Sequence, residues 1–136
     1  MKLFGLFSTK QNPDNKFVSE TSYRKNKDNQ VNMTPQTIKQ LREYGVTESE
    51  KLKLEYFFYT NNIDKARNLA VEFQKMNYTV KYGKSSGDKK LFVITGWTNK
   101  MAIADSVIID WTKQMCDLGY EFDCEFDGWG TEPAQE

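Results

Sequence analysis

The order of periodic segments between Leu52 and Phe126 constrains the fold of this chain more than any other feature. Four segments show the alternating or continuous apolar pattern of β-strands, and two show apolar residues at the three- and four-residue spacing of helices. The strand segments are 52–60, 78–82, 90–98 and 120–126, and the helical segments are 61–76 and 99–119. This order, strand–helix–strand–strand–helix–strand, predicts an α+β, ferredoxin-like βαββαβ fold.

The predicted sheet has four antiparallel strands, and both long helices cover the same face of it. In this topology the first and third strands are central, and the second and fourth lie at the edges. Segments 52–60 and 90–98 contain apolar residues for both faces, which is typical of central strands. Composition and topology therefore support the same arrangement.

The N-terminal region is more polar than the rest of the chain. Residues 8–33 are rich in Ser, Thr, Lys, Asn, Gln and Asp, so few side chains there can offset the entropy cost of ordering. We expect a flexible polar arm over residues 1–33 and a single domain over residues 34–136. The apolar run Leu3–Phe7 is shorter than the core of a signal peptide.

A short helix should open the domain. Thr34 suits an N-cap and Pro35 suits the first helical position. Gly45 suits the stop after the helix. The apolar residues between them recur at helical spacing: Ile38, Leu41 and Tyr44.

Composition argues against catalysis. The chain has no histidine, the commonest general base and metal ligand, and its net charge is zero. Cys116 and Cys124 are too few for a zinc site and are expected to be reduced core residues. We therefore predict a protein without enzymatic activity, metal or cofactor. No apolar run approaches the length of a membrane span, so a cytoplasmic location is expected.

The negative charge gathers at the C-terminal end. Residues 117–136 carry seven acidic and no basic side chains. Four carboxylates alternate with apolar residues and would share the helix-free face of the last strand: Glu121, Asp123, Glu125 and Asp127. This acidic row either protects an edge strand from pairing or docks a basic partner segment. A calcium loop starting at Asp123 is excluded, because its twelfth position is Ala134 instead of a glutamate.

The segment Asp127–Gly130 is predicted to form a compact turn. Gly128 and Gly130 permit the positive φ angles of a tight reversal. Trp129 either packs against the helix that carries Trp111 or forms an exposed contact for a partner. We count Trp129 with the acidic row as the candidate partner-binding residues.

RNA binding by the sheet is a further interpretation. Sheets of this topology stack bases on aromatic side chains of their central strands, and Phe57, Tyr59 and Phe92 are the candidates here. The third strand lacks the Gly/aromatic signature of such sheets, and the acidic row would repel phosphates. We expect the short first helix to cover part of this face instead.

The chain from about Leu52 to Thr131 resembles the ribonuclease E inhibitor family of type B (regulator of ribonuclease activity B). The resemblance rests on the strand Leu54–Tyr59, on Tyr78–Tyr82, and above all on Phe126–Thr131 after the last strand. It implies a small bacterial cytoplasmic protein that binds an RNA-degrading endonuclease and lowers its activity.

The sequence departs from that family in two ways. Its net charge is neutral rather than strongly acidic, and its head is a basic, polar arm in place of an acidic helix. The identity of the partner therefore stays open. The alternatives are an immunity-type protein that neutralises a toxin and a module that binds RNA directly.

Overall fold

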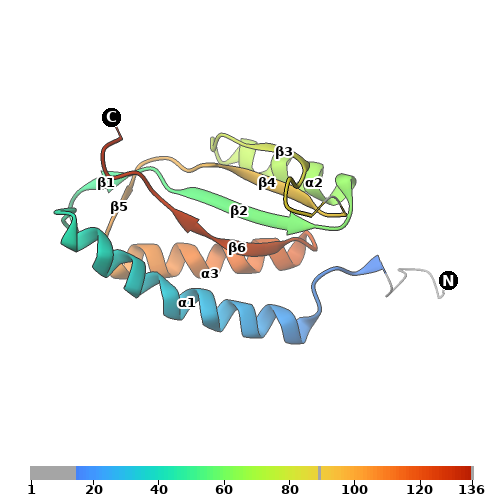
Figure 1. Cartoon of the computed structure of the whole chain (residues 1–136), viewed down its shortest axis with the longest axis horizontal. Helices are drawn as coiled ribbons and strands as arrows, with labels where there is room; N and C mark the ends of the chain where they lie inside the picture. The colour runs from blue at the N-terminus through green and yellow to red at the C-terminus, as the bar shows by residue number, and fades with distance from the viewer. Residues whose placement is uncertain (1–14, 89, 136) are drawn as a thin grey trace.

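The computed structural model describes residues 15–88 and 90–135, and these residues form a mixed α+β structure (Figure 1). Their helices are α1 (Glu20–Glu43), α2 (Ile63–Lys75) and α3 (Asp105–Glu121). Their strands are β1 (Lys51–Leu52), β2 (Glu55–Thr60), β3 (Lys81–Lys84), β4 (Phe92–Trp97), β5 (Met101–Ala102) and β6 (Glu125–Gly130). The run Leu3–Phe7 lies outside the described residues.

The main sheet has four antiparallel strands in the order β3-β4-β2-β6. The predicted mixed α+β class and four-stranded antiparallel sheet are confirmed, with β2 and β4 in the centre. The predicted strand 52–60 is divided in two, because its first residues leave the main sheet. Leu52 joins Lys51 in β1, which pairs with β5 in a separate two-stranded sheet, and β2 begins at Glu55.

Helices α2 and α3 lie behind the main sheet in the view of Figure 1, and α1 lies beside α3. The start of α2 is as predicted, because the Asn62 side chain accepts hydrogen bonds from the backbone N–H groups of Asp64 and Lys65. Phe58 from β2 meets Phe73 of α2 and Phe126 of β6, with ring centroids 5.4 and 5.0 Å apart. These aromatic contacts join the sheet to its helical layer.

Helix α1 begins earlier than its sequence predicts. Ser19 is the N-cap, and its Oγ accepts a hydrogen bond from the backbone N–H of Ser22. Residues 20–33 are therefore helical, and Thr34 and Pro35 lie inside the helix rather than at its start. The predicted stop at Gly45 is confirmed, with φ +89° just beyond the helix.

Helix α3 is shifted relative to its predicted bounds. It begins at Asp105 rather than after Asn99, because Met101–Ala102 pair with β1 first. It continues past Gly119 to Glu121. The lack of a side chain at Gly119 lets the helix pack closely at that residue. A Cβ at Gly119 would lie 2.6 Å from the backbone oxygen of Cys124. Asp123, with φ +58°, makes the reversal into β6 instead.

Both cysteines are buried and unpaired, as predicted for core residues. Burial raises the pKa of each thiol to about 12. Cys116 and Cys124 therefore stay protonated at neutral pH and act as small apolar side chains. None of the helices in residues 15–88 and 90–135 combines the length and apolar character that a membrane-spanning helix needs.

Candidate functional site

The four carboxylates of the acidic row do not share one strand. Glu121 is the last residue of α3, Asp123 lies in the reversal after it, and only Glu125 and Asp127 belong to β6. The prediction of a single acidic strand face from Glu121 to Asp127 is wrong. The helical apolar spacing of α3 prevails over the strand-like alternation in the first half of this segment.

Asp123 is held in internal contacts. Its carboxylate accepts hydrogen bonds from the backbone N–H groups of Phe17 and Val18, each at 2.8 Å, and from Lys65 Nζ at 2.6 Å. Desolvation pushes the pKa of Asp123 upward, but the hydrogen bonds and the charge of Lys65 outweigh it and hold that pKa below its ordinary value. Asp123 thus joins the segment before α1 to the start of α2.

Trp129 packs inward. It lies in β6 opposite Tyr56 of β2, and its ring meets the ring of Trp111 edge-on, with centroids 6.4 Å apart. Its Nε1–H donates a hydrogen bond to Thr34 Oγ1 at 3.1 Å. Of the two interpretations of Trp129, the contact with the helix that carries Trp111 is therefore present.

The predicted turn Asp127–Gly130 is wrong, because these residues continue β6. Phe57 pairs with Gly128 and Phe58 pairs with Phe126, so Asp127 is the extra residue of a β-bulge. Gly128 has φ +114°, the left-handed conformation that glycine allows in such a bulge. Gly130 pairs with Glu55 in the regular ladder.

Helix α1 covers the outer edge of β6. Asn26 Nδ2 donates a 2.8 Å hydrogen bond to the backbone oxygen of Phe126, and the Gln30 side chain approaches the bulge at Gly128. The edge is therefore shielded by a helix rather than by the acidic row alone. The expectation that the first helix covers the open face of the sheet is wrong, since α1 packs against α3 and β6.

Glu125 and Asp127 differ from Asp123 in having no ion-pair partner among residues 15–88 and 90–135. Desolvation raises the pKa of Glu125, and the nearby charge of Asp127 raises it further. Desolvation also raises the pKa of Asp127. Two adjacent carboxylates that are partly desolvated and lack a cation would gain from a basic partner group.

Glu125 faces the helix-free side of the sheet. It lies opposite Tyr59, which alternates along β2 with residues buried under the helices. The register places six further side chains on this side of β2 and β4, and we call the whole set the open sheet face. Besides Glu125 it contains Glu55, Phe57, Tyr59, Val93, Thr95 and Trp97.

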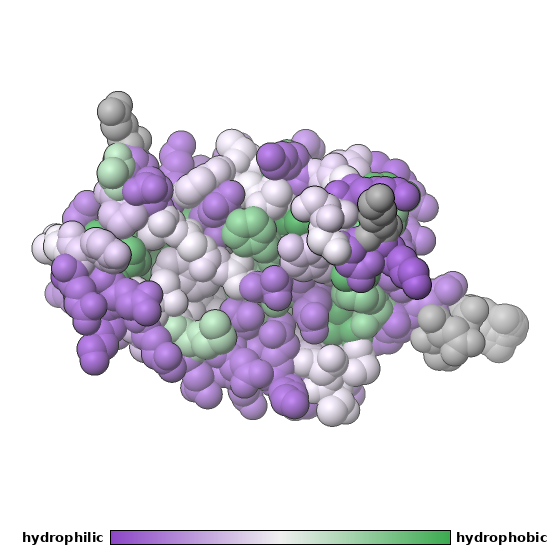
Figure 2. Space-filling view, viewed as in Figure 1, coloured by the Kyte–Doolittle hydropathy of each residue, from purple (hydrophilic) through white to green (hydrophobic). Residues whose placement is uncertain are grey.

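The open sheet face is turned to the viewer in Figure 1, and Figure 2 shows neutral and apolar side chains across the middle of this view with hydrophilic ones around them. Phe57, Tyr59 and Trp97 are each half-buried. Thr95, which lies opposite Phe57, has a buried Oγ1 with no hydrogen-bond partner in the described residues. Aromatic rings beside unpaired carboxylates suit a protein segment that carries apolar and basic side chains.

Phe92 does not belong to this face. It lies opposite the buried Thr60 and packs against the core, so its prediction as an open-face aromatic is wrong. Sequence reasoning missed Glu55, Val93 and Trp97. Strict alternation along the central strands, applied from Phe57 outward, was the signal that would have found them.

Potential metal ligands do not gather at one place in the part of the chain that the structure describes. Among residues 15–88 and 90–135, no group of three or more His, Cys, Asp or Glu side chains is placed to hold a metal ion. The site is an open surface rather than an enclosed cavity, which suits recognition of a macromolecule.

A comparison with models of protein families matches residues 32–131 to the model described as regulator of ribonuclease activity B. A search of curated proteins finds no match. The match covers the helices and strands from the second half of α1 to the end of β6, including the open sheet face. This chain belongs to the family of regulators of ribonuclease activity B.

Proposed function

We propose that this protein binds a ribonuclease and lowers its activity without acting as an enzyme itself. The family supports a role in regulating ribonuclease activity. An endonuclease of the ribonuclease E type in the bacterial cytoplasm is the partner we propose. We also propose the ferredoxin-like topology for the fold, which the strand order β3-β4-β2-β6 supports.

The open sheet face, together with Asp127, is the docking surface that we propose. The observation that carries this assignment is the neighbouring pair of the half-buried Glu125 and the exposed Asp127, neither of which has an ion-pair partner among the described residues. Lys or Arg side chains of the ribonuclease would relieve this unfavourable state. Phe57, Tyr59 and Trp97 would supply the apolar and cation–π contacts beside them.

Asp123 and Trp129 were predicted to bind the partner, and their contacts now support a structural role. Glu121 is exposed at the end of α3 and does not belong to β6, which carries Glu125 and Asp127. Gly128 and Gly130 contribute through the backbone of β6, since Gly128 forms the bulge beside Gln30 of α1 and Gly130 pairs with Glu55.

Reversing both charges, Glu125→Lys with Asp127→Lys, should weaken binding to a purified ribonuclease E-type endonuclease by about tenfold or more. The loss should be largest at low salt, because screening weakens charge–charge attraction. The measurement is calorimetric affinity together with the RNA cleavage rate in excess regulator. A matched control is Glu43→Lys with Glu48→Lys, which changes the net charge equally at two exposed positions.

The outcomes separate the function from its surface. If the wild-type protein neither binds the nuclease nor slows cleavage, the proposed function is wrong. If the wild-type protein does both and the Glu125/Asp127 variant performs equally well, the assignment of the open sheet face as the docking surface is wrong. Rescue of cells from a toxin, with no effect on any ribonuclease, would instead support the immunity-type alternative.

Direct RNA binding predicts a different result on the same face. Phe57, Tyr59 and Trp97 could stack bases, but Glu55, Glu125 and Asp127 stand beside them and would repel phosphates. We therefore expect no salt-sensitive gel shift of single-stranded RNA by the wild-type protein. A shift that disappears at high salt would contradict this expectation.

A further inference from the structure

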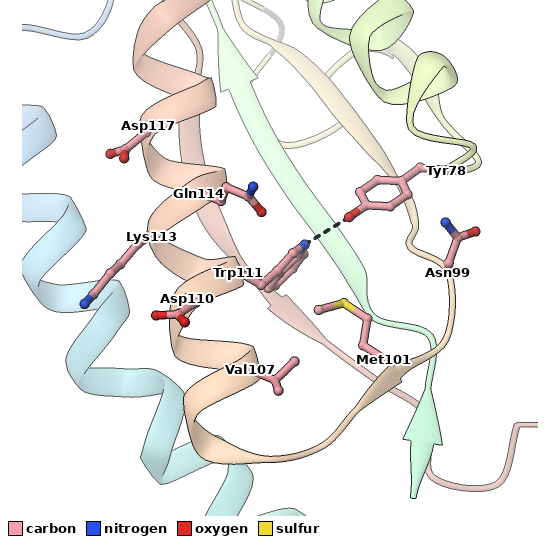
Figure 3. A pocket seen from close by; sticks show the side chains of 9 residues that line it. All are labelled: Tyr78, Asn99, Met101, Val107, Asp110, Trp111, Lys113, Gln114 and Asp117. Carbon is pink, nitrogen blue, oxygen red and sulfur yellow. Dashed lines mark hydrogen bonds between the residues drawn. The ribbon is translucent and has the colours of Figure 1, made fainter. Parts of the chain in front are cut away.

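A groove lies on the helical side of the molecule, away from the open sheet face. It has a volume of about 720 Å³, and Figure 3 shows its walls, α3 on one side and Tyr78, Asn99 and Met101 on the other. A smaller hollow of about 190 Å³ adjoins it and shares Gln114 and Asp117 with it. This second hollow extends the groove toward the end of α3, between Met76 and Leu118.

The floor of the groove is apolar and adaptable. Met101 lines the larger hollow, and Met76 and the buried Met115 line the smaller one, so three of the five methionines of the chain lie here. Methionine side chains are flexible and are favoured where a surface must fit helices of varied sequence. Trp111 forms a fixed wall, because its Nε1–H donates a 3.3 Å hydrogen bond to the hydroxyl of Tyr78.

The α3 side of the groove also presents an exposed apolar ridge. Val107 is 40 % exposed and points toward Met101 in Figure 3. A helix bound in the groove would cover it. The half-buried Leu118 continues the ridge, and the polar Gln114 lies between Val107 and Leu118 at helical spacing. From Val107 to Glu121 this surface runs about 21 Å, or roughly four helical turns.

The rim of the groove is acidic. Asp110, Asp117 and Glu121 line the two hollows together with a single basic residue, Lys113. Asp117 is paired with Lys27 at 2.7 Å. Asp110 and Glu121 have no ion-pair partner among residues 15–88 and 90–135.

Figure 3 shows how charge and apolar surface are divided on α3. Asp110, Lys113 and Asp117 project on the side of the helix that faces α1, and Val107, Trp111 and Gln114 project toward Tyr78. An occupant of the groove would therefore meet apolar side chains below and, along one flank, Asp110 and Asp117 with Lys113 between them.

We propose that this groove binds an amphipathic helix with a basic flank, supplied by a protein partner. Its apolar side chains, spaced i, i+3, i+4 and i+7, would lie on the methionine floor. Its Lys and Arg side chains would face Asp110 and Glu121 across the α3 ridge. This inference goes beyond the proposed function, because the groove is on the other side of the sheet from the open face. One molecule could then engage two protein segments at once.

The test uses a synthetic peptide as the probe. A fluorescein-labelled peptide of sequence LKKLLKLLKKLLKL forms a basic amphipathic helix, and LEELLELLEELLEL is its acidic counterpart. Fluorescence anisotropy should show binding of the basic peptide and weaker binding of the acidic one at about 0.05 M salt. Val107→Arg should weaken binding of the basic peptide by about tenfold or more, since it places a like charge on the ridge.

The control for Val107→Arg is Val71→Arg on α2. Val71 is 43 % exposed and lies outside both hollows, so this variant gains the same charge at a similar helical site. Circular dichroism establishes that both variants fold. Equal binding by the two folded variants, or equal binding of the two peptides, would overturn the proposal. The Glu125→Lys/Asp127→Lys protein should still bind the basic peptide, so this test can fail without the proposed ribonuclease surface failing.

Discussion

Asp123→Asn is expected to lower the free energy of unfolding by about 2–3 kcal/mol at neutral pH, because charged hydrogen bonds are lost from a partly buried site. The Asp123 side chain is only 17 % exposed and accepts from Phe17, Val18 and Lys65. An amide has one oxygen, so it cannot accept from both backbone N–H groups and the ammonium in the same geometry. Asparagine also tolerates the left-handed backbone at this position, so the substitution isolates the carboxylate.

The effect of Asp123→Asn should depend on pH. The folded-state pKa of Asp123 is lowered, so its stabilisation is present above the unfolded-state pKa of about 3.9. That stabilisation is lost as the pH falls through the lower, folded-state value. Urea unfolding of wild type and variant should therefore show a clear difference at neutral pH and a shrinking difference in acid.

Asp127→Asn is the matched control for Asp123→Asn. Its folded-state pKa is raised, which means that folding disfavours its charge. Removing this charge should be neutral or slightly stabilising at pH values above that pKa, on the order of 0.5 kcal/mol or less because the residue is exposed. Equal losses for the two variants would contradict the structural role of Asp123. Unchanged ribonuclease binding by folded Asp123→Asn would support a structural role for Asp123 and a binding role for Asp127.

Helix α2 and the central strands could be predicted from sequence because their signals are local. Asn62 caps α2 through the backbone N–H groups of its own first turn, and the apolar stripe that follows has a single period. The strand segments around Phe58 and Ile94 are apolar enough to be central in any arrangement. Local preference and tertiary packing agree at these positions.

The first half of α1 could not be predicted in this way. Its contacts are polar and distant, such as Asn26 with the backbone of Phe126, one hundred positions away. Tyr23 similarly stacks on Tyr120 with ring centroids 4.3 Å apart. A segment stabilised by such contacts has the composition of a flexible arm, and composition was the only available signal.

The candidate site was predicted in part, for a related reason. The segment before Glu125 satisfies two periods at once, since Met115, Leu118 and Phe122 recur at helical spacing while Tyr120, Phe122 and Cys124 alternate. The structure uses the first period up to Glu121 and the second only from Glu125. Glu125 and Asp127 therefore remain candidate contacts, and Asp123 becomes an internal anchor.

Gly96→Ala is expected to lower the free energy of unfolding by about 3 kcal/mol or more, because the new methyl group has no room. A Cβ at Gly96 would lie 1.9 Å from the backbone oxygen of Thr79 and 2.7 Å from the hydroxyl of Tyr56. That hydroxyl donates a 2.7 Å hydrogen bond to the same Thr79 oxygen, so it passes through the space that Gly96 leaves open. Alanine would separate the start of β3 from β4 and leave a buried hydroxyl without its partner.

The control for Gly96→Ala is Gly83→Ala on the neighbouring strand. Gly83 pairs with Val93 in the same sheet, and a Cβ there would meet nothing within 4 Å. Its substitution should change stability by no more than about 0.5 kcal/mol. Tyr56→Phe combined with Gly96→Ala should recover only part of the loss, because the clash with the Thr79 backbone remains. Thermal unfolding of the three variants distinguishes the two causes. A clash with the backbone predicts partial recovery in the double variant, whereas lost hydrogen bonding alone predicts full recovery.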